Sequence, residues 1–307
     1  MRTFRAPIAS LAAQAVALLL AAATLGACTL FSDAARDERA DVLTIASWNM
    51  EHLAASDGSG CRPRTPADYA ALRAYADQID ADVVAFQEVE SAAAAARVFD
   101  PSRWTILIEQ RAGSGRRGEC GGRPGLYLTR QAVGFAVRRE LQLGRHPDFV
   151  ELQIGQDDLR SGVDVTVSRR RGVPIRLLSV HLKSGCASGA TGSPCETLFR
   201  QIPVLERWID LRASEGERFA VLGDFNRRLA APSDRVWSEL DDGEPINADL
   251  AYASGARTAG CDPRYPQFID HMVLDRTAAA GVGEFQEHVY VGERLSDHCA
   301  ISVEVAG

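Results

Sequence analysis

The stretch Phe219-Ala220-Val221-Leu222-Gly223-Asp224-Phe225-Asn226 decides the fold of this 307-residue chain. Its first four residues are apolar, as in a buried strand, and the apolar run stops at Gly223 and Asp224. In open α/β sheets, ligands bind just outside the carboxyl ends of the strands. Although Gly-Asp also forms ordinary turns, we therefore expect Asp224 and Asn226 to lie at a functional edge of a sheet.

Five further apolar runs carry polar residues at or beside one end. These residues are Asn49 and Glu51, then Gln87 and Glu88, then His181 and Lys183, then Asp270, and finally Ser296, Asp297 and His298. A polar group that is buried without a partner costs about 1–3 kcal/mol, so six unrelated intrusions would be strongly destabilising. We therefore expect the strand ends to converge on one site that binds something charged.

The residue types at these strand ends favour phosphoryl transfer. Carboxylates such as Glu88 bind hard divalent cations, and Mg²⁺ prefers oxygen ligands. Asn49 offers an amide oxygen beside that carboxylate, and an Asp next to a His orients the imidazole and keeps it basic. Asn, Lys and His donate hydrogen bonds to phosphate oxygens, where charge must be stabilised in the transition state. The pattern predicts Mg²⁺ as the cofactor, with Mn²⁺ or Ca²⁺ as alternatives.

Strand-like and helical runs alternate from Asp41 onward, without an internal repeat or a second domain boundary. We expect strands at 42–48, 82–86, 126–138, 163–168, 173–182, 219–223, 268–274 and 300–305. We expect helices at 66–78, 91–99, 193–213 and 234–240, the first with Thr65 as its cap and the third with Ser193-Pro194 at its start. Residues 110–125 indicate a Gly- and Arg-rich loop. This alternation places the chain in the α/β class.

The ordered set of motifs resembles the endonuclease/exonuclease/phosphatase superfamily over residues 41–305. The motifs are Trp48-Asn49-x-Glu51, Gln87-Glu88, His181, Gly223-Asp224-Phe225-Asn226, Asp270 and Ser296-Asp297-His298. Each motif alone is weak, whereas the set in this order is specific. The resemblance implies one domain at 41–307, built as a four-layer α/β/β/α sandwich of two packed mixed β-sheets flanked by helices.

The resemblance also implies a role for each matching residue. Glu88 would be the main Mg²⁺ ligand, with Asn49 near the metal, Glu51 in its outer shell, and Asp297 paired with His298 or holding the metal's waters. Asp270 would orient a catalytic histidine, and His298 would contact the scissile phosphate or take a proton from water. Asp224 would position or activate the attacking water, and Asn226 would bind a phosphate oxygen. His181 matches the histidine of the deoxyribonuclease-like and sphingomyelinase-like branches.

Three enzyme classes and one binding class remain open at this point. His181-Leu182-Lys183-Ser184-Gly185 resembles the secreted nucleases, so a phosphodiesterase that cuts DNA or RNA is the leading interpretation. A sphingomyelinase-like phospholipid phosphodiesterase is the first alternative, although we find no apolar hairpin for membrane docking. An inositol-phosphate phosphatase is the second alternative, and it lacks the family's Pro-Ala-Trp-Cys-Asp-Arg signature. A binding module on a decayed nuclease fold would lack a ligand or base, and none is missing.

Residues near these motifs have competing interpretations. Lys183 alternates onto the same strand face as His181, which favours contact with the substrate. His271 follows Asp270 and should point to the opposite face, which favours a structural role. The arginines of 117–130 and of 169–171 are either solvated surface or guides for a polyanion.

The N-terminus predicts export. Arg2 and Arg5 precede an uncharged run at 6–23, which is typical of a secretory signal. Leu25-Gly26-Ala27-Cys28 resembles the bacterial lipobox, so we expect a lipoprotein signal peptide at 1–27, lipidation of Cys28 and a tether at 28–40. An ordinary signal peptide or a retained membrane span are the alternatives. Thr29 after Cys28 favours the outer membrane in a diderm organism.

Charge and cysteine content agree with an exported enzyme. The chain has a formal net charge of −7, and loss of the two arginines of the leader makes it −9. Such an acidic protein is a poor non-specific binder of nucleic acid, so affinity for phosphate must be local. Six cysteines follow Cys28, namely Cys61, Cys120, Cys186, Cys195, Cys261 and Cys299. We expect Cys186–Cys195 and Cys61–Cys120 disulfides and, by elimination, Cys261–Cys299, with a buried free Cys299 as the alternative. We expect a monomer.

Overall fold

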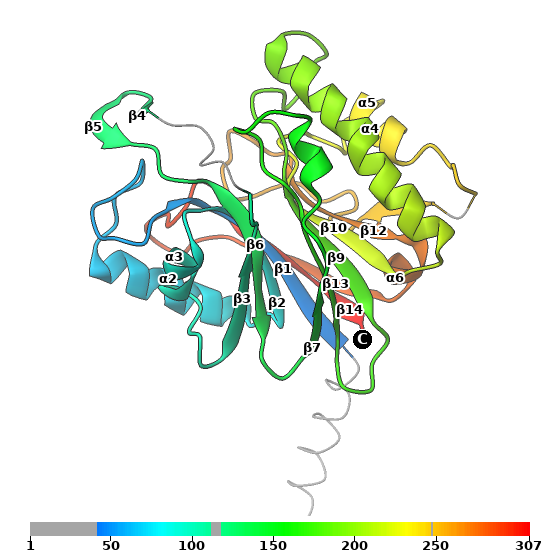
Figure 1. Ribbon diagram of the computed structural model, residues 1–307, viewed down its shortest axis with the longest axis horizontal. Helices are drawn as coiled ribbons and strands as arrows, with labels where there is room; N and C mark the ends of the chain where they lie inside the picture. The colour runs from blue at the N-terminus through cyan, green and yellow to red at the C-terminus, as the bar shows by residue number, and fades with distance from the viewer. Residues whose placement is uncertain (1–41, 112–117, 247) are drawn as a thin grey trace, which may run out of the picture. The chain divides into compact units, whose positions relative to one another are not determined.

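The computed structural model describes residues 42–111, 118–246 and 248–307 (Figure 1). The expected signal peptide at 1–27, Cys28 and the tether at 28–40 lie outside this part of the chain, so they stay predictions. None of the helices in the described part combines the length and the apolar character that a membrane span requires.

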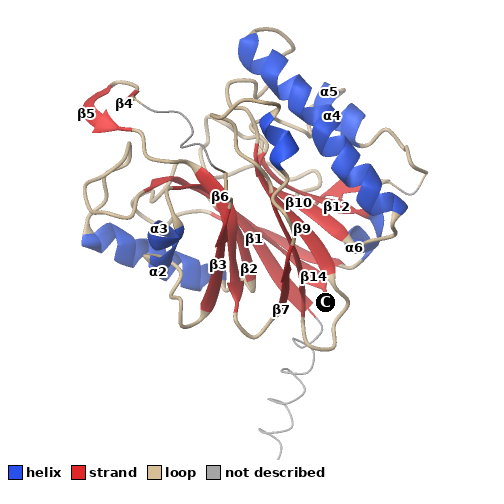
Figure 2. Cartoon of the chain, viewed as in Figure 1, coloured by secondary structure: helices blue, strands red, loops and turns tan. Residues whose placement is uncertain are grey.

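Two six-stranded sheets form the centre of the unit Leu43–Gly307 (Figure 2). The first sheet has the order β13-β14-β1-β2-β6-β3, with β1 Val42–Leu53, β2 Val83–Val89, β3 Trp104–Ile108, β6 Ala132–Arg138, β13 Val282–His288 and β14 Ala300–Ala306. The second has the order β11-β12-β10-β9-β8-β7, with β7 Gln142–Arg145, β8 Val163–Ser168, β9 Ile175–His181, β10 Phe219–Asp224, β11 Leu250–Tyr252 and β12 Asp270–Asp275. Both sheets are mixed, because β1 and β2 pair in parallel, as do β9 and β10, while the flanking pairs β2–β6 and β10–β12 are antiparallel.

Helices cover the outer face of each sheet. On the first sheet lie α2 (Pro66–Ile79) and α3 (Ala92–Ala96), whose buried residues share a core with β1 and β2. On the second sheet lie α4 (Ser193–Ser214) and α5 (Arg235–Leu240), which share a core with β9 and β10. A short α6 (Arg276–Ala280) and a 3₁₀ helix at Val150–Gln153 complete the helical segments. The expected four-layer α/β/β/α sandwich is confirmed.

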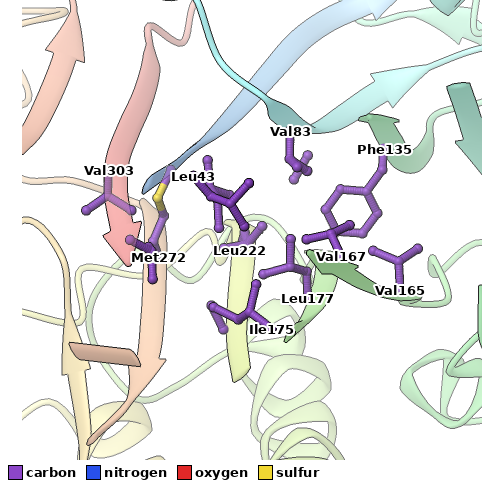
Figure 3. Packing of buried hydrophobic residues seen from close by; sticks show 14 of the residues in the cluster. Leu43, Val83, Phe135, Val165, Val167, Ile175, Leu177, Leu222, Met272 and Val303 are labelled. Atoms are coloured by element: carbon purple, nitrogen blue, oxygen red, sulfur yellow. The ribbon is translucent and has the colours of Figure 1, made fainter. Parts of the chain in front are cut away.

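The strands divide their apolar side chains between two cores, because successive residues of a strand point to opposite faces. In β10, Ala220 and Leu222 join the core between the sheets, whereas Phe219 and Val221 join the core beneath α4. Figure 3 shows Leu222 in the inter-sheet core together with residues of the first sheet such as Leu43. A strand that is apolar on both faces is therefore buried on both faces, as the continuous run at 219–222 predicts.

The expected helices and strands exist with shifts at several boundaries, with two exceptions: the strand expected at 126–138 is divided between β5 (Arg123–Tyr127) and β6, and one expected cap is wrong. Thr65 caps α2 through a reciprocal contact with Asp68, and Asp234 caps α5. Ser193 does not cap α4; the helix already begins at Ser193, and the preceding Gly192 has no capping side chain. The loop expected at 110–125 contains part of a small hairpin, β4 (Glu119–Cys120) with β5 (Arg123–Tyr127).

The three expected disulfides are present. Cys61–Cys120 ties the loop after β1 to the β4–β5 hairpin, and Cys186–Cys195 closes the loop before α4. Cys261–Cys299 joins the loop before β12 to the residue preceding β14. The alternative of a free, buried Cys299 is therefore wrong in this structure.

The close backbone contact at Gly223 gives a testable prediction about packing at the functional edge of the second sheet. A Cβ atom on Gly223 would lie 2.0 Å from the Val180 carbonyl oxygen, and its φ of +143° is one that L-residues rarely adopt. We expect Gly223→Ala to lower the free energy of unfolding by about 3 kcal/mol, measured by urea denaturation. Gly144→Ala, whose Cβ would meet nothing closer than 3.9 Å, is the matched control and should change it by less than about 1 kcal/mol. Equal effects of the two variants would contradict this account.

Candidate active site

The polar strand ends meet at one edge of the two sheets. The register of the second sheet explains how, because Asp224 of β10 is paired with His181 of β9 on one side and Asp270 of β12 on the other. The first sheet contributes Asn49, whose side-chain nitrogen donates to Asp224 Oδ2 at 3.1 Å. Residues that are 175 positions apart in the chain are thus joined by a buried hydrogen bond between the sheets.

Asp224 is the centre of the group. It is 2% exposed, and its Oδ1 accepts the backbone N–H of Asn226 at 2.7 Å. Its Oδ2 lies 3.5 Å from His181 Nε2 and 3.9 Å from His298 Nε2. Burial, followed by the nearby Asp270 carboxylate, raises the pKa of Asp224 to about 7. This carboxylate therefore changes its protonation state near neutral pH.

Asp270 holds His298 in place. His298 Nδ1 lies 2.6 Å from Asp270 Oδ2, and the backbone N–H of His298 donates to Ser296 Oγ. Ser296 in turn donates to the Asn49 carbonyl oxygen at 2.7 Å, which fixes this loop against β1. Burial alone would lower the pKa of His298, but the charge of Asp270 and the hydrogen bond to it outweigh burial and raise this pKa well above its ordinary value. His298 is therefore a cation at neutral pH.

His181 has the opposite protonation state to His298. It is almost completely buried, and burial lowers its pKa well below the ordinary value. The positive charge of Arg160 adds to this effect. The cluster thus combines a neutral imidazole and a protonated one on two sides of the same carboxylate.

Glu88 and Glu51 form the acidic side of the site. Glu88 Oε2 accepts the backbone N–H of His52 at 3.1 Å, and Glu88 Oε1 lies 3.9 Å from His181 Nε2. Glu51 makes a 3.0 Å ion pair with Arg62 and accepts the backbone N–H of Asp297 at 2.9 Å. Asn49 Oδ1, which accepts the backbone N–H of Glu51, adds an amide oxygen beside them. An oxygen-rich group of this kind fits a hard divalent cation.

Backbone strain is concentrated at these strand ends. Glu51, His52, Glu88 and Asn226 have φ angles of +41°, +53°, +59° and +51°, in the left-handed region that non-glycine residues rarely occupy. Such conformations cost about 1–3 kcal/mol each and are found mainly at functional sites. These four residues lie at or beside the ends of β1, β2 and β10, where the polar strand ends meet.

A second set of potential metal ligands lies within the cluster. Ligand atoms of Asp224, Asp270 and His298 all lie within 4.8 Å of one another. Cys261, Glu287 and Cys299 are similarly close, but the two cysteines form a disulfide and cannot act as thiolate ligands. The described residues therefore hold a candidate metal site of carboxylate and imidazole groups.

Two cavities adjoin the site. The metal-side cleft, of about 550 Å³, is lined by Glu51, His52, Glu88, Lys183 and Ser184, together with Arg123 and Arg160. The His298 cleft, of about 380 Å³, is lined by His298, Asp270 and Asp297, together with Arg228, Arg294, Tyr265 and Phe268. The expected residues are thus brought together: Lys183 reaches the first cleft, and Asn226 lies behind Asp224 with its side chain donating to the Leu182 carbonyl oxygen.

Several residues at the site were not expected from the sequence. His52 lies 3.6 Å from Glu88, and Arg160 is held by the backbone and side-chain oxygens of Gln131 at the wall of the metal-side cleft. His52 lies at the end of β1, beyond its apolar run and next to the Asn49–Glu51 motif, whereas Arg160 lies in a loop that no motif marks. Of the arginine runs, Arg123 lines the metal-side cleft, whereas Arg169 makes an ion pair with Asp82.

Solved structures share the fold of this chain. Truncated TDP2 from Caenorhabditis elegans superposes with a TM-score of 0.60 at 16% identity, covering 87% of this chain and 98% of that one. AP endonuclease LMAP from Leishmania major gives a TM-score of 0.57 at 13% identity, covering 88% and 89%. The 3'-5' exonuclease NExo from Neisseria meningitidis gives 0.52 at 16% identity, covering 86% and 100%. No curated protein matches the sequence.

A family model also matches the sequence. It is the model described as the endonuclease/exonuclease/phosphatase family, and it matches residues 46–298. The match covers most of the chain and includes every one of the expected site residues from Asn49 to His298.

His271 predicts how stability depends on pH. Its ring lies on the opposite face of β12 from the site, as expected, where Nε2–H donates to the Arg227 carbonyl oxygen at 2.8 Å. Burial lowers the pKa of His271 from 6.5 to about 4, so the unfolded chain takes up this proton first as pH falls. The contribution of the neutral ring to the free energy of unfolding is therefore fully present above pH 6.5, and it falls by about 3 kcal/mol as the pH drops to about 4.

The measurement is the free energy of unfolding across this range for the wild type and for His271→Gln, whose amide can still donate to Arg227. We expect the difference in the free energy of unfolding between the two proteins to shrink as pH falls, because only the wild type carries the titrating ring. A difference that stays constant from pH 7 to pH 4 would contradict the assigned pKa.

Proposed function

The chain belongs to the endonuclease/exonuclease/phosphatase family, and from this premise we propose that it is an exported, metal-dependent phosphodiesterase that hydrolyses nucleic acid. Members of this family are hydrolases of the phosphodiesterase and nuclease kind. The observation that carries the proposal is the buried cluster in which Asp224 contacts Asn49, His181 and His298. Water attacks the phosphorus in line with the leaving oxygen.

In this proposal Asp224 accepts the proton of the attacking water. A general base works best when its pKa lies near the working pH, and the raised pKa of Asp224, about 7, meets this condition. His298, kept protonated by Asp270, donates to a phosphate oxygen and stabilises the charge that develops there. Neutral His181 and the amide of Asn226 complete the contacts with the phosphate.

Glu88 would hold Mg²⁺, with the oxygen of Asn49 beside it. Bound Mg²⁺ would supply positive charge for the phosphoryl oxygens. Glu51 is already engaged by Arg62 and by the Asp297 backbone, which suits an outer-shell role that orients rather than ligates. The Asp297 side chain is 61% exposed and lies 3.9 Å from His298 Nε2, so it would pair with His298 or hold waters of the metal.

Nucleic acid is the substrate that the charges of the metal-side cleft favour. Arg123, Arg160 and Lys183 line this cleft beside the carboxylates Glu51, Glu88, Glu119 and Asp158. We propose that the three cations contact the phosphate backbone while Glu88 holds the metal. Two of the structural neighbours are an AP endonuclease and a 3'-5' exonuclease by name.

Export and lipid anchoring at Cys28 complete the proposal. The three disulfides support an oxidising compartment, since disulfides are rare in the cytosol. The lipid would hold a monomeric enzyme to the cell envelope, on the outer membrane in a diderm organism.

The experiment is an activity assay of the purified protein on plasmid DNA, RNA, sphingomyelin vesicles and inositol phosphates, each with Mg²⁺ or with EDTA. We expect cleavage of DNA or RNA that requires Mg²⁺. Asp224→Asn and His298→Gln should lower kcat by about 10²–10⁴-fold, the usual contribution of acid–base groups. His146→Gln, which removes a histidine that contacts Thr166 outside the site, is the matched control. Full activity in EDTA, or hydrolysis of sphingomyelin alone, would refute the proposal.

The lipid anchor has a separate test. Expressed in a diderm bacterium, the wild-type chain should label with a fatty-acid probe and sediment with the outer-membrane fraction. Cys28→Ala should lose the label, because the lipid is attached to that side chain. Equal labelling of the two proteins would exclude Cys28 as the anchor.

A further inference from the structure

The His298 cleft differs in chemistry from the metal-side cleft. Its wall contains Phe268, Ile269 and Ile301 together with the Cys261–Cys299 disulfide. Tyr265 lies at its rim with 56% of its surface exposed. An exposed aromatic ring above an apolar wall is an unusual neighbour for a cluster of carboxylates and imidazoles, because it adds nothing to the binding of a phosphate.

The wall of this cleft is held rigidly. The disulfide fixes Cys261 to the residue after His298, and Glu287 accepts the backbone N–H groups of Gly260 and Cys261 at 2.7 and 3.0 Å. Asp262 then accepts hydrogen bonds from Arg264 and Arg294. The loop is therefore already formed before any ligand arrives, so binding does not have to order it.

The cleft also opens onto the reacting groups. His298 and Asp270 belong to its wall, so a phosphate placed on His298 would carry one of its ester substituents into this space. A volume of about 380 Å³ is within the range of small-molecule sites. Arg228 at the lining offers hydrogen-bond donors, and Phe268, Ile269 and Ile301 offer apolar surface.

We propose that the His298 cleft binds the base of the nucleotide joined to the scissile phosphate. This inference rests on the proposed function, and it adds that the substrate must carry a base next to the scissile phosphate. A nucleobase has two apolar faces and a polar edge, which match the Tyr265 and Phe268 rings and the arginine donors respectively. An acyl chain would cover the Arg228 guanidinium without offering it a hydrogen-bond acceptor.

The test compares two substrates with the same backbone charge. One is a short oligothymidylate, and the other has the same length and phosphates but carries tetrahydrofuran spacers in place of every nucleoside. Stacking on aromatic side chains has a known range per base, which corresponds to a preference of about 5- to 150-fold. We expect the wild type to prefer the base-containing oligomer by that factor in kcat/KM, and Tyr265→Ala to lose most of the preference through KM.

Three controls keep the test decisive. Tyr265→Trp should retain the preference, and Tyr127→Ala, which removes another exposed tyrosine outside the cleft, should leave it unchanged. Thermal unfolding checks that each variant is folded. Equal cleavage of both oligomers by the wild type would overturn the base subsite while leaving the phosphodiesterase proposal intact, whereas failure to cleave either oligomer, plasmid DNA or RNA would refute the proposed function itself. Sphingomyelin hydrolysis that Tyr265→Ala abolishes would assign the cleft to a lipid instead.

Discussion

The buried carboxylate of Asp224 is the constraint on which the rest of the site depends. A buried charge without partners is strongly destabilising, so Asp224 needs donors from every element around it. Asn49 reaches it from the first sheet and the Asn226 backbone from its own turn, while His181 and His298 approach from the sides. These contacts fix how the two sheets are placed against each other at this edge. Burial and the neighbouring Asp270 carboxylate raise the pKa of Asp224 to about 7, although the hydrogen bonds from Asn226 and Asn49 and the charge of His298 oppose this rise.

The backbone geometry at this edge of the sheets follows from the need to surround Asp224 with partners. Gly223 allows β10 to approach the Val180 carbonyl more closely than any side chain would permit. Glu51, Glu88 and Asn226 take left-handed conformations, and each lies directly at the end of a well-packed strand. Four of the seven non-glycine residues with positive φ in the described part of the chain lie at these strand ends, and the other three, Asp80, Ile154 and Ser233, lie beside helix ends. Local rules are broken where the chemistry is, as expected for a functional site.

The fold could be predicted from the sequence where buried strands give continuous apolar runs. β1, β9 and β10 are apolar on both faces because they lie between two cores, and their polar ends identify Asn49, His181 and Asp224. The four edge strands of the two large sheets, β3, β7, β11 and β13, were missed, since edge strands are partly exposed and three of these four have little apolar pattern. Arg160 and Tyr265 lie in loops that reach the site only through tertiary contacts, and no periodicity marks such positions.

Disulfides explain how clefts whose walls include loops can be formed before the substrate binds. Cys61–Cys120 belongs to the wall of the metal-side cleft, and Cys261–Cys299 belongs to the wall of the His298 cleft. Arg227, through its guanidinium, holds the Cys186 and Gly189 carbonyls and so fixes the third loop beside Lys183. Each cleft therefore has a cross-linked wall, and the metal-side cleft also contains the strained residues Glu51, His52 and Glu88. In the proposed function, selectivity would arise from the different chemistry of these two walls, since the His298 cleft adds the apolar side chains of Phe268, Ile269 and Ile301.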